Sequence, residues 1–350
     1  MRTGFDYARA MAPFWLSTTQ YDESLLMVSA GAGLPEARLL FRPEQIVSLT
    51  DSALRTEYVY GIDWLYDPVA NAIRLPAGSR APFLTEDELY PPVPGPDTLY
   101  RTGGGHILGK MSGGFFHEKQ LAVTYRIASN DWGGPVPVFE PGLLPRTIGR
   151  LTAGSPLKIA FFGDSITLGA DASGYLNVPP FMPGWEKLVE RKLIGSYSSA
   201  VSTVNLSLYG KNSIVGAESA AALVAPEKPD LVVVAFGMND GAVVSPDAFR
   251  NNIRTIIQDV KAGHPPAEFI LVSTMLPNPE TSFYAMQASY REELAKLVGP
   301  GVALADMTRI HQELLLRKPY RDMTGNHINH PNDYLVRWYA QVVSALLVPG

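Results

Sequence analysis

The chain has 350 residues, of which 46% are hydrophobic and 18% are charged, with a formal net charge of −5 and no cysteine. This composition is typical of a globular protein long enough for two domains, and the lack of cysteine excludes disulfides, thiolate nucleophiles and thiolate zinc sites. A net negative chain without a long Lys/Arg run gives no indication of binding to nucleic acid or to an anionic membrane surface.

The first apolar cluster of the chain is too short for a signal-peptide core or a membrane span. It runs from Met11 to Leu16 and contains Pro13, whereas a signal-peptide core takes about 7–15 apolar residues and a span about 20. We therefore expect a soluble chain with no membrane partner and, for the sequence as it stands, a cytoplasmic location.

Residues 1–153 show short apolar runs separated by Gly, Pro, Asp and Ser, and no stretch sustains a helical period over several turns. The runs are Leu25–Val28, Arg38–Phe41, Gln45–Leu49, Glu57–Tyr60 and Leu121–Ile127. The pattern predicts antiparallel strands in a smaller domain of the sandwich or jelly-roll type.

Two segments of this region are interpreted as connections. Pro91–Pro96 is too rich in proline for a helix or a central strand, so we expect a loop. The run Gly103-Gly104-Gly105-His106 is similar to the oxyanion loops of lipases, but it lies in the β-rich region and is interpreted as a glycine-rich turn.

Residues 154–350 alternate between strand and helix patterns. The predicted strands are Lys158–Phe162, Val201–Leu206, Leu231–Phe236, Phe269–Ser273 and Val302–Leu304. The predicted helices are Trp185–Ile194, Ser213–Val224, Pro246–Ala262, Phe283–Leu297, Arg309–Leu316 and Asp333–Leu347. This alternation predicts a parallel sheet covered by helices on both faces, with ligands bound beyond the carboxyl ends of its strands.

A serine follows the first of these strands directly. The strand ends in Gly163-Asp164-Ser165, and the glycine permits a sharp turn that would present the hydroxyl for attack. The alternative is a strand-to-helix turn in which Ser165 only caps the helix.

Candidate oxyanion donors follow two neighbouring strands. Asn239 comes after the strand Leu231–Phe236 and carries an uncharged amide donor, and Gly210 offers a backbone N–H after the strand that passes through Asn205. Taken alone, each of these residues is also consistent with an ordinary turn.

A candidate base lies just before the last predicted helix. His330 precedes Pro331 and Asn332 on the loop that leads into this helix. A neutral imidazole there can take the serine proton if the loop reaches back over the strand ends.

Taken together, these four segments resemble the SGNH hydrolases, the GDSL-type esterases and lipases. The match runs in chain order through Gly163-Asp164-Ser165, Gly210, Gly237-Met238-Asn239-Asp240 and His330-Pro331-Asn332, and covers about Lys158 to Leu347. The resemblance implies a flavodoxin-like three-layer α/β/α domain over residues 154–350 and acyl transfer to water without a cofactor. By position, it implies Ser165 as nucleophile and His330 as base. It also implies an oxyanion hole formed by the backbone N–H groups of Ser165 and Gly210 with the side chain of Asn239.

One position departs from this family pattern. The family places an aspartate three residues before its histidine, and this chain has His327 there, which cannot supply an anion to the imidazole. A Ser165–His330 dyad with a backbone carbonyl orienting the ring, or a carboxylate supplied by Asp322 or Asp333, are the alternatives we favour over an inactive domain.

The pair His327 and His330 also permits a metal interpretation. No third ligand stands out, and the segment contains Gly325 and Pro331 and is expected to be a loop, so we expect no metal site.

The resemblance predicts a serine esterase that acts on short acyl esters of a small molecule or oligosaccharide, with O-deacetylation of a carbohydrate preferred because a β-rich domain precedes the catalytic one. The loop from Tyr175 to Pro183, with Trp185, is interpreted either as the wall of a sugar pocket or as an apolar loop packing on its own domain. A thioesterase or lysophospholipase, and a glycan-binding protein with an inactive SGNH domain, are the competing interpretations. The oligomeric state is left open.

Overall fold

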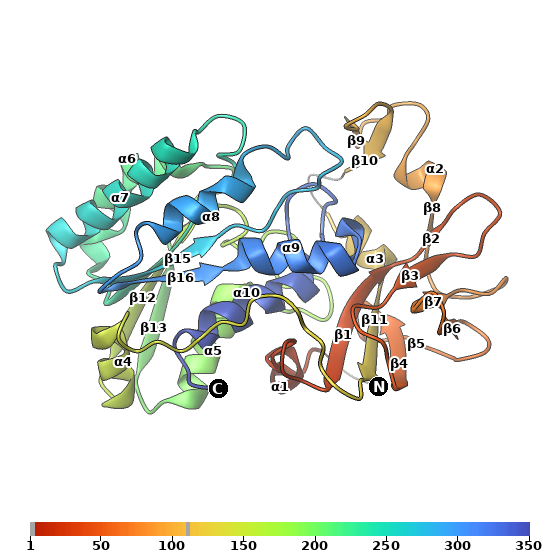
Figure 1. The fold of residues 1–350 in the computed structure, drawn as a ribbon, viewed down its shortest axis with the longest axis horizontal. Helices are drawn as coiled ribbons and strands as arrows, with labels where there is room; N and C mark the ends of the chain where they lie inside the picture. The colour runs from red at the N-terminus through yellow and green to blue at the C-terminus, as the bar shows by residue number, and fades with distance from the viewer. Residues whose placement is uncertain (1–3, 110–112) are drawn as a thin grey trace.

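The computed structural model describes residues 4–109 and 113–350, which form an α/β part and a β-rich part lying side by side (Figure 1). The parallel strands of the α/β part point their carboxyl ends toward the β-rich part (Figure 1). No helix within the described residues is both long and apolar enough to cross a bilayer.

The α/β part is built on a parallel sheet with the strand order β13-β12-β14-β15-β16. Its strands are β12 (Leu157–Gly163), β13 (Val201–Asn205), β14 (Leu231–Ala235), β15 (Glu268–Ser273) and β16 (Val302–Asp306). Numbered from β12, this order is 2-1-3-4-5, the flavodoxin-like arrangement. The predicted fold class and all five predicted strands of this part are therefore confirmed.

Helices cover both faces of this sheet because its inner strand β12 is apolar on both sides. Ile159 and Phe161 of β12 pack in one core, and Ala160 and Phe162 pack in the other. Buried side chains of α5 (Trp185–Ser196), α9 (Met307–Arg317) and α10 (Asp333–Ala345) enter the first core. Those of α6 (Ser213–Leu223), α7 (Pro246–Gly263) and α8 (Gln287–Ala295) enter the second. The helix predicted from Phe283 begins four residues later, at Gln287, because the chain forms a turn and then a bend before it.

The β-rich part consists mainly of two sheets, with strand orders β1-β11-β4-β5 and β6-β7-β3-β2-β8, together with the hairpin β9–β10. The strands of the first sheet are β1 (Thr19–Leu26), β4 (Gln45–Asp51), β5 (Glu57–Tyr58) and β11 (Gln120–Arg126). Those of the second are β2 (Val28–Ser29), β3 (Glu36–Arg38), β6 (Leu65–Asp67), β7 (Ala72–Arg74) and β8 (Leu84–Thr85). The hairpin is formed by β9 (Thr98–Tyr100) and β10 (His106–Leu108), and the short helices of this part are α1 (Tyr7–Ala10), α2 (Glu86–Leu89) and α3 (Phe115–Lys119).

The expected β-rich region is thus present, and most of its predicted runs fall on strands. The run predicted over 38–41 is wrong for three of its four residues, because β3 ends at Arg38 and the apolar residues that follow are buried without strand pairing. The segment 91–96 is a loop, as predicted, and Gly103–Gly105 form the turn of the β9–β10 hairpin with positive φ angles.

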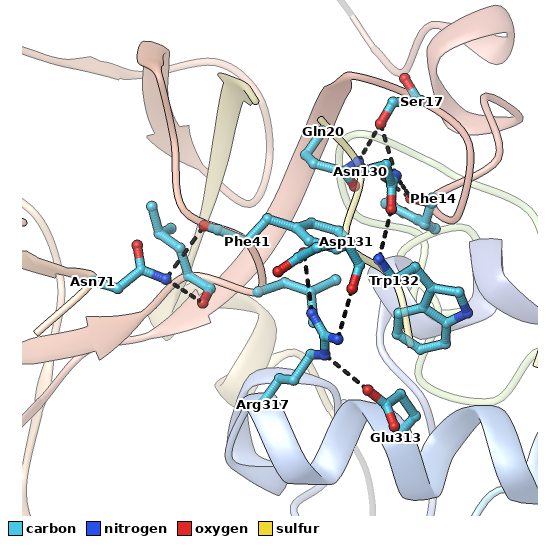
Figure 2. Close-up of polar contacts among 12 residues, drawn as sticks. Phe14, Ser17, Gln20, Phe41, Asn71, Asn130, Asp131, Trp132, Glu313 and Arg317 are labelled. Carbon is cyan, nitrogen blue, oxygen red and sulfur yellow. Dashed lines mark hydrogen bonds and ion pairs between the residues drawn. The ribbon is translucent and has the colours of Figure 1, made fainter. Parts of the chain in front are cut away.

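A long connection joins the two parts and is fixed at several points. Residues 127–144 contain no helix or strand and lead into α4 (Pro145–Thr152). Asn130 donates from Nδ2 to the carbonyl of Phe14 at 2.7 Å, and Arg317 on α9 donates to the carbonyl of Asp131 at 2.9 Å (Figure 2). The connection therefore lies against both parts of the molecule.

The interface between the two parts is a continuous buried core. Phe14 stacks on Trp338 of α10 with ring centroids 4.6 Å apart. Lys318, just after α9, forms a fully buried ion pair with Glu23 of β1. Apolar and charged side chains are thus both buried between the two parts. The division of the chain into domains 1–153 and 154–350 stays a prediction.

Candidate active site

The turn after β12 positions Ser165 at the carboxyl edge of the sheet. A Cβ at Gly163 would lie 2.4 Å from the carbonyl oxygen of Ala235, so only glycine fits where β12 passes β14. Asp164 then accepts a hydrogen bond on Oδ1 from the backbone N–H of Ile166 at 3.0 Å, which holds the turn. The Oγ atom of Ser165 lies 2.8 Å from Nε2 of His330, so its hydroxyl faces the imidazole.

His330 lies on a loop between the 3₁₀ turn η2 (Tyr320–Asp322) and α10, and Asn326 holds its backbone in place. The side-chain oxygen of Asn326 accepts from the backbone N–H groups of Ile328, Asn329 and His330 at 2.9–3.0 Å. Thr324 Oγ1 donates to the carbonyl of His330 at 2.9 Å. The imidazole is thus presented by a loop in which its own backbone N–H and C=O are both bonded.

A third residue completes this chain of hydrogen bonds, and sequence reasoning missed it. Nδ1 of His330 lies 2.7 Å from Oδ2 of Asp171, and both side chains are almost fully buried. A carboxylate acceptor places the ring proton on Nδ1, which leaves Nε2 to accept from the Ser165 hydroxyl. Asp171 adopts a φ of +64° in the left-handed region, which aspartate tolerates better than most residues.

The residues that the sequence suggested for orienting His330, Asp322 and Asp333, do not contact its imidazole and have other partners. Asp322 accepts from the backbone N–H of Leu26 at 2.9 Å and lies 3.2 Å from Nζ of Lys318, so it belongs to the buried ion pair. Asp333 accepts from the backbone N–H of Ser173 at 2.8 Å. A dyad with a backbone carbonyl on the imidazole is also wrong, because the Nδ1 partner is the Asp171 carboxylate.

His327, which occupies the family's aspartate position, points away from the site. Its Nδ1 donates to the carbonyl of Leu108 at 2.8 Å, and burial lowers the pKa of its imidazole to about 4. His327 and His330 thus have different partners. Among residues 4–109 and 113–350, no group of three or more His, Asp or Glu side chains is arranged to hold a metal ion.

A weak sequence signal for Asp171 existed. It follows Ser165 by only six positions in the small-residue run Gly169-Ala170-Asp171-Ala172-Ser173. The matching signal in the histidine loop is Gly325, where a Cβ would lie 2.6 Å from the Cβ of Asp171. A glycine is required there because the two loops approach so closely.

The two predicted oxyanion donors lie on neighbouring loops that are joined to each other. Gly210, with a φ of +68°, follows β13, and Asn239 follows β14. Nδ2 of Asn239 donates to the carbonyl of Lys211 at 3.0 Å, so one amide hydrogen holds the glycine loop and the other stays available.

Two buried carboxyl groups, those of Asp164 and Asp240, lie next to these loops. Burial, together with the nearby charge of Asp240, raises the pKa of Asp164 to about 7. Burial also raises the pKa of Asp240, which accepts from the N–H and hydroxyl of Ser213 at the start of α6. Asp164 is therefore largely uncharged at mildly acidic pH.

The exposed aromatic side chain of Tyr209 forms a rim beside His330. The Tyr209 ring stands edge-on to His330 with centroids 6.0 Å apart, and 48% of its surface is exposed. Burial of part of the ring, with smaller contributions from Asp171 and Tyr175, raises the pKa of Tyr209. Tyr175 is itself 53% exposed. Trp185, in contrast, is fully buried between Phe161 and Tyr339 and is not available for stacking on a sugar.

The sequence is also similar to a known family of hydrolases. Residues 161–335 match the model of the GDSL-like lipase/acylhydrolase family. The esterase TesA of Pseudomonas aeruginosa is 34% identical over 119 residues, which cover 33% of this chain and 53% of that protein. The chain thus spans about half the length of this curated relative.

Two solved structures illustrate the more distant likeness. One is a two-domain esterase active on acetylated mannans, with 22% identity, a TM-score of 0.49 and coverage of 61% of this chain and 54% of that one. The other is a carbohydrate esterase of family 3 from Talaromyces cellulolyticus, with 17% identity, a TM-score of 0.43 and coverage of 54% and 94%.

Proposed function

Because the chain belongs to the GDSL-like lipase/acylhydrolase family, we propose that it is a serine esterase that hydrolyses short-chain carboxylic esters through an acyl-serine intermediate. The observation that carries this proposal is the continuous hydrogen-bond chain from Ser165 through His330 to Asp171. A hydroxyl, a neutral imidazole and a carboxylate in this order are the groups that nucleophilic acyl transfer requires.

The reaction proceeds in two balanced steps. The Oγ atom of Ser165 attacks the acyl carbonyl while Nε2 of His330 takes the hydroxyl proton, and the bond to the alcohol breaks as His330 returns that proton to the leaving oxygen. Water then attacks the acyl-serine, again losing a proton to His330, and the acid leaves as Ser165 is reprotonated. Asp171 orients the ring and stabilises the imidazolium formed in each step.

The oxyanion formed in each step is proposed to be bound by the backbone N–H groups of Ser165 and Gly210 and by Nδ2 of Asn239. The bond from Asn239 to the carbonyl of Lys211 supports this arrangement, since it fixes the amide and the glycine loop as one unit. Donors fixed before the reaction stabilise developing charge without reorganisation.

Two observations favour acetyl removal from a carbohydrate. Ser165 is 1% exposed and His330 is 2% exposed, so a small acyl group reaches the nucleophile with less displacement of protein than a long chain does. The exposed ring of Tyr209 beside His330, and the exposed ring of Tyr175 in the loop that follows Ser165, suit stacking on a sugar that carries the ester.

The first experiment is labelling with a fluorophosphonate probe, read by mass spectrometry. We expect a single adduct at Ser165, which is absent in Ser165→Ala, together with loss of p-nitrophenyl acetate hydrolysis in that variant. Wild-type turnover by Ser165→Ala would refute the mechanism. An unlabelled wild type whose N-terminal region binds sugar would instead favour a glycan-binding protein with an inactive SGNH domain.

A chain-length series of p-nitrophenyl esters tests the acyl group. We expect kcat/KM to fall steeply beyond butyrate, whereas a thioesterase or lysophospholipase would prefer longer chains. Tyr209→Ala is expected to raise the KM for an acetylated oligosaccharide more than the KM for p-nitrophenyl acetate, because only the former reaches the rim.

A further inference from the structure

The β-rich part of the molecule bonds directly to the loop that carries His330. This loop, residues 323–332, is closed by hydrogen bonds between its ends, from Asn332 N–H to the carbonyl of Met323 at 3.2 Å and from Gly325 N–H to the carbonyl of His330 at 3.0 Å. Its closed end rests against β1 and β11. We propose that Gln120 of β11 is a positioning residue for His330, so that the β-rich part completes the active site.

Gln120 contacts both ends of this loop with one side chain. Its Nε2 donates to the carbonyl of Thr324 at 2.8 Å and to that of Arg321 at 3.2 Å, and its Oε1 accepts from Nδ2 of Asn332 at 3.0 Å. The side chain is buried, with 2% of the residue exposed. A buried amide with every polar atom bonded fixes the distance between the two ends that it joins.

Asn332 links Gln120 to His330 and to the start of α10. Its Nδ2 also donates to Oγ of Ser24 on β1 at 2.9 Å, and its Oδ1 accepts from the N–H of Leu335 as the N-cap of the helix. Only Pro331 separates Asn332 from His330. A shift of this side chain therefore moves the imidazole relative to Ser165.

A second contact from the β-rich part reaches the segment that follows Asp171, the partner of the imidazole. Nε2 of His117 on α3 donates to the carbonyl of Pro179 at 2.7 Å, in the segment that runs on from Asp171. The backbone N–H of Met182, in the same segment, donates to Oγ of Ser173 at 2.8 Å. The loops that carry His330 and Asp171 are thus both bonded to residues of the first sheet or of α3.

The inference rests on the proposed function, because misplacement matters only if His330 transfers protons. Displacing a catalytic group by about 1 Å costs up to about 10²-fold in rate, and partners that orient such groups are commonly worth 10–100-fold.

The test compares Gln120→Ala with Gln45→Ala, a matched control on the same sheet whose side chain is exposed. Active-site titration with a fluorophosphonate counts competent sites, so turnover is expressed per titrated Ser165. We expect Gln120→Ala to lose about 10–100-fold in per-site kcat with little change in KM, and Gln45→Ala to match the wild type. The downfield proton resonance of the His330–Asp171 hydrogen bond should broaden or disappear in Gln120→Ala only.

A purely structural role would lower the number of titrated sites and leave per-site kcat and the resonance unchanged, and this result would overturn the inference. If Gln120→Ala does not fold, Ser24→Ala replaces it. That variant removes one bond to Asn332 and is expected to lower per-site kcat about 5-fold, the effect of one neutral hydrogen bond, and wild-type turnover would again overturn the inference. A wild type that the fluorophosphonate does not label at Ser165 would overturn the proposed function as well.

Discussion

Replacing Asp171 with asparagine removes one charge from the site while keeping nearly the same shape. Oδ2 of Asp171 lies 2.7 Å from Nδ1 of His330, and about 5% of its side chain is exposed. Two unit charges about 4 Å apart attract by about 4 kcal/mol at an effective dielectric constant near 20, and this attraction arises only when His330 becomes an imidazolium in the transition state. At 1.36 kcal/mol per factor of ten, Asp171→Asn is expected to lose about 10³-fold in kcat.

The assay is steady-state hydrolysis of p-nitrophenyl acetate with kcat and KM determined separately. KM should change little, because the neutral substrate complex does not contain the imidazolium. Asp247→Asn is the matched control, since the side chain of Asp247 is 76% exposed and lies outside the site. If Asp171→Asn folds and stays within about 3-fold of wild-type kcat, an effect below 1 kcal/mol, then Asp171 does not orient the base and the reasoning from geometry is refuted.

Four further predictions concern neighbouring groups. Asn239→Ala should keep its melting temperature and lose about 10²–10³-fold in kcat, as expected for one oxyanion donor, and an unchanged kcat would remove it from the oxyanion hole. Gly325→Ala places a Cβ 2.6 Å from that of Asp171 and should lower kcat about 10–100-fold, whereas Gly195→Ala, where a Cβ meets nothing within 4 Å, should be silent. Burial raises the pKa of Asp164 to about 7 from 3.8, so this group's contribution to the free energy of unfolding is highest below pH 4 and falls by up to about 4 kcal/mol toward pH 7. In urea unfolding, the free energy of unfolding of Asp164→Asn should therefore increase relative to that of the wild type from pH 4 to pH 7. A difference between the two proteins that does not change with pH would contradict the raised pKa. Burial lowers the pKa of His327 to about 4, so its ring proton resonances should not titrate between pH 8 and 5.5, and a midpoint near 6.5 would show an exposed imidazole.

The main features of the α/β part could be predicted from the sequence because they depend on local patterns. The five strands of the parallel sheet are short apolar runs between helical segments, and a strand buried on both faces leaves this signature without reference to distant residues. The positions of Ser165, Gly210 and Asn239 follow from the same rule, since each comes shortly after a strand and the carboxyl ends of parallel strands share one edge.

The orienting carboxylate was decided by the tertiary structure. Asp171 and His330 are 159 positions apart, and their contact depends on a left-handed turn after Ser165 and on the absence of a Cβ at Gly325. Neither feature has a period or a motif that a single sequence displays. The aspartates nearest to His330 in the sequence, Asp322 and Asp333, have carboxylates that bond elsewhere.

The contribution of the β-rich part is likewise a property of the folded chain. The sequence indicated short strands in residues 1–153, and it placed Gln120 one residue before a predicted strand, where a polar side chain has no obvious role. Once the two parts pack, that side chain becomes buried against the loop of His330 and must find partners there. Local patterns thus determined the sheet and the position of Ser165 at its edge, while the orientation of His330 depends on contacts between segments that only folding brings together.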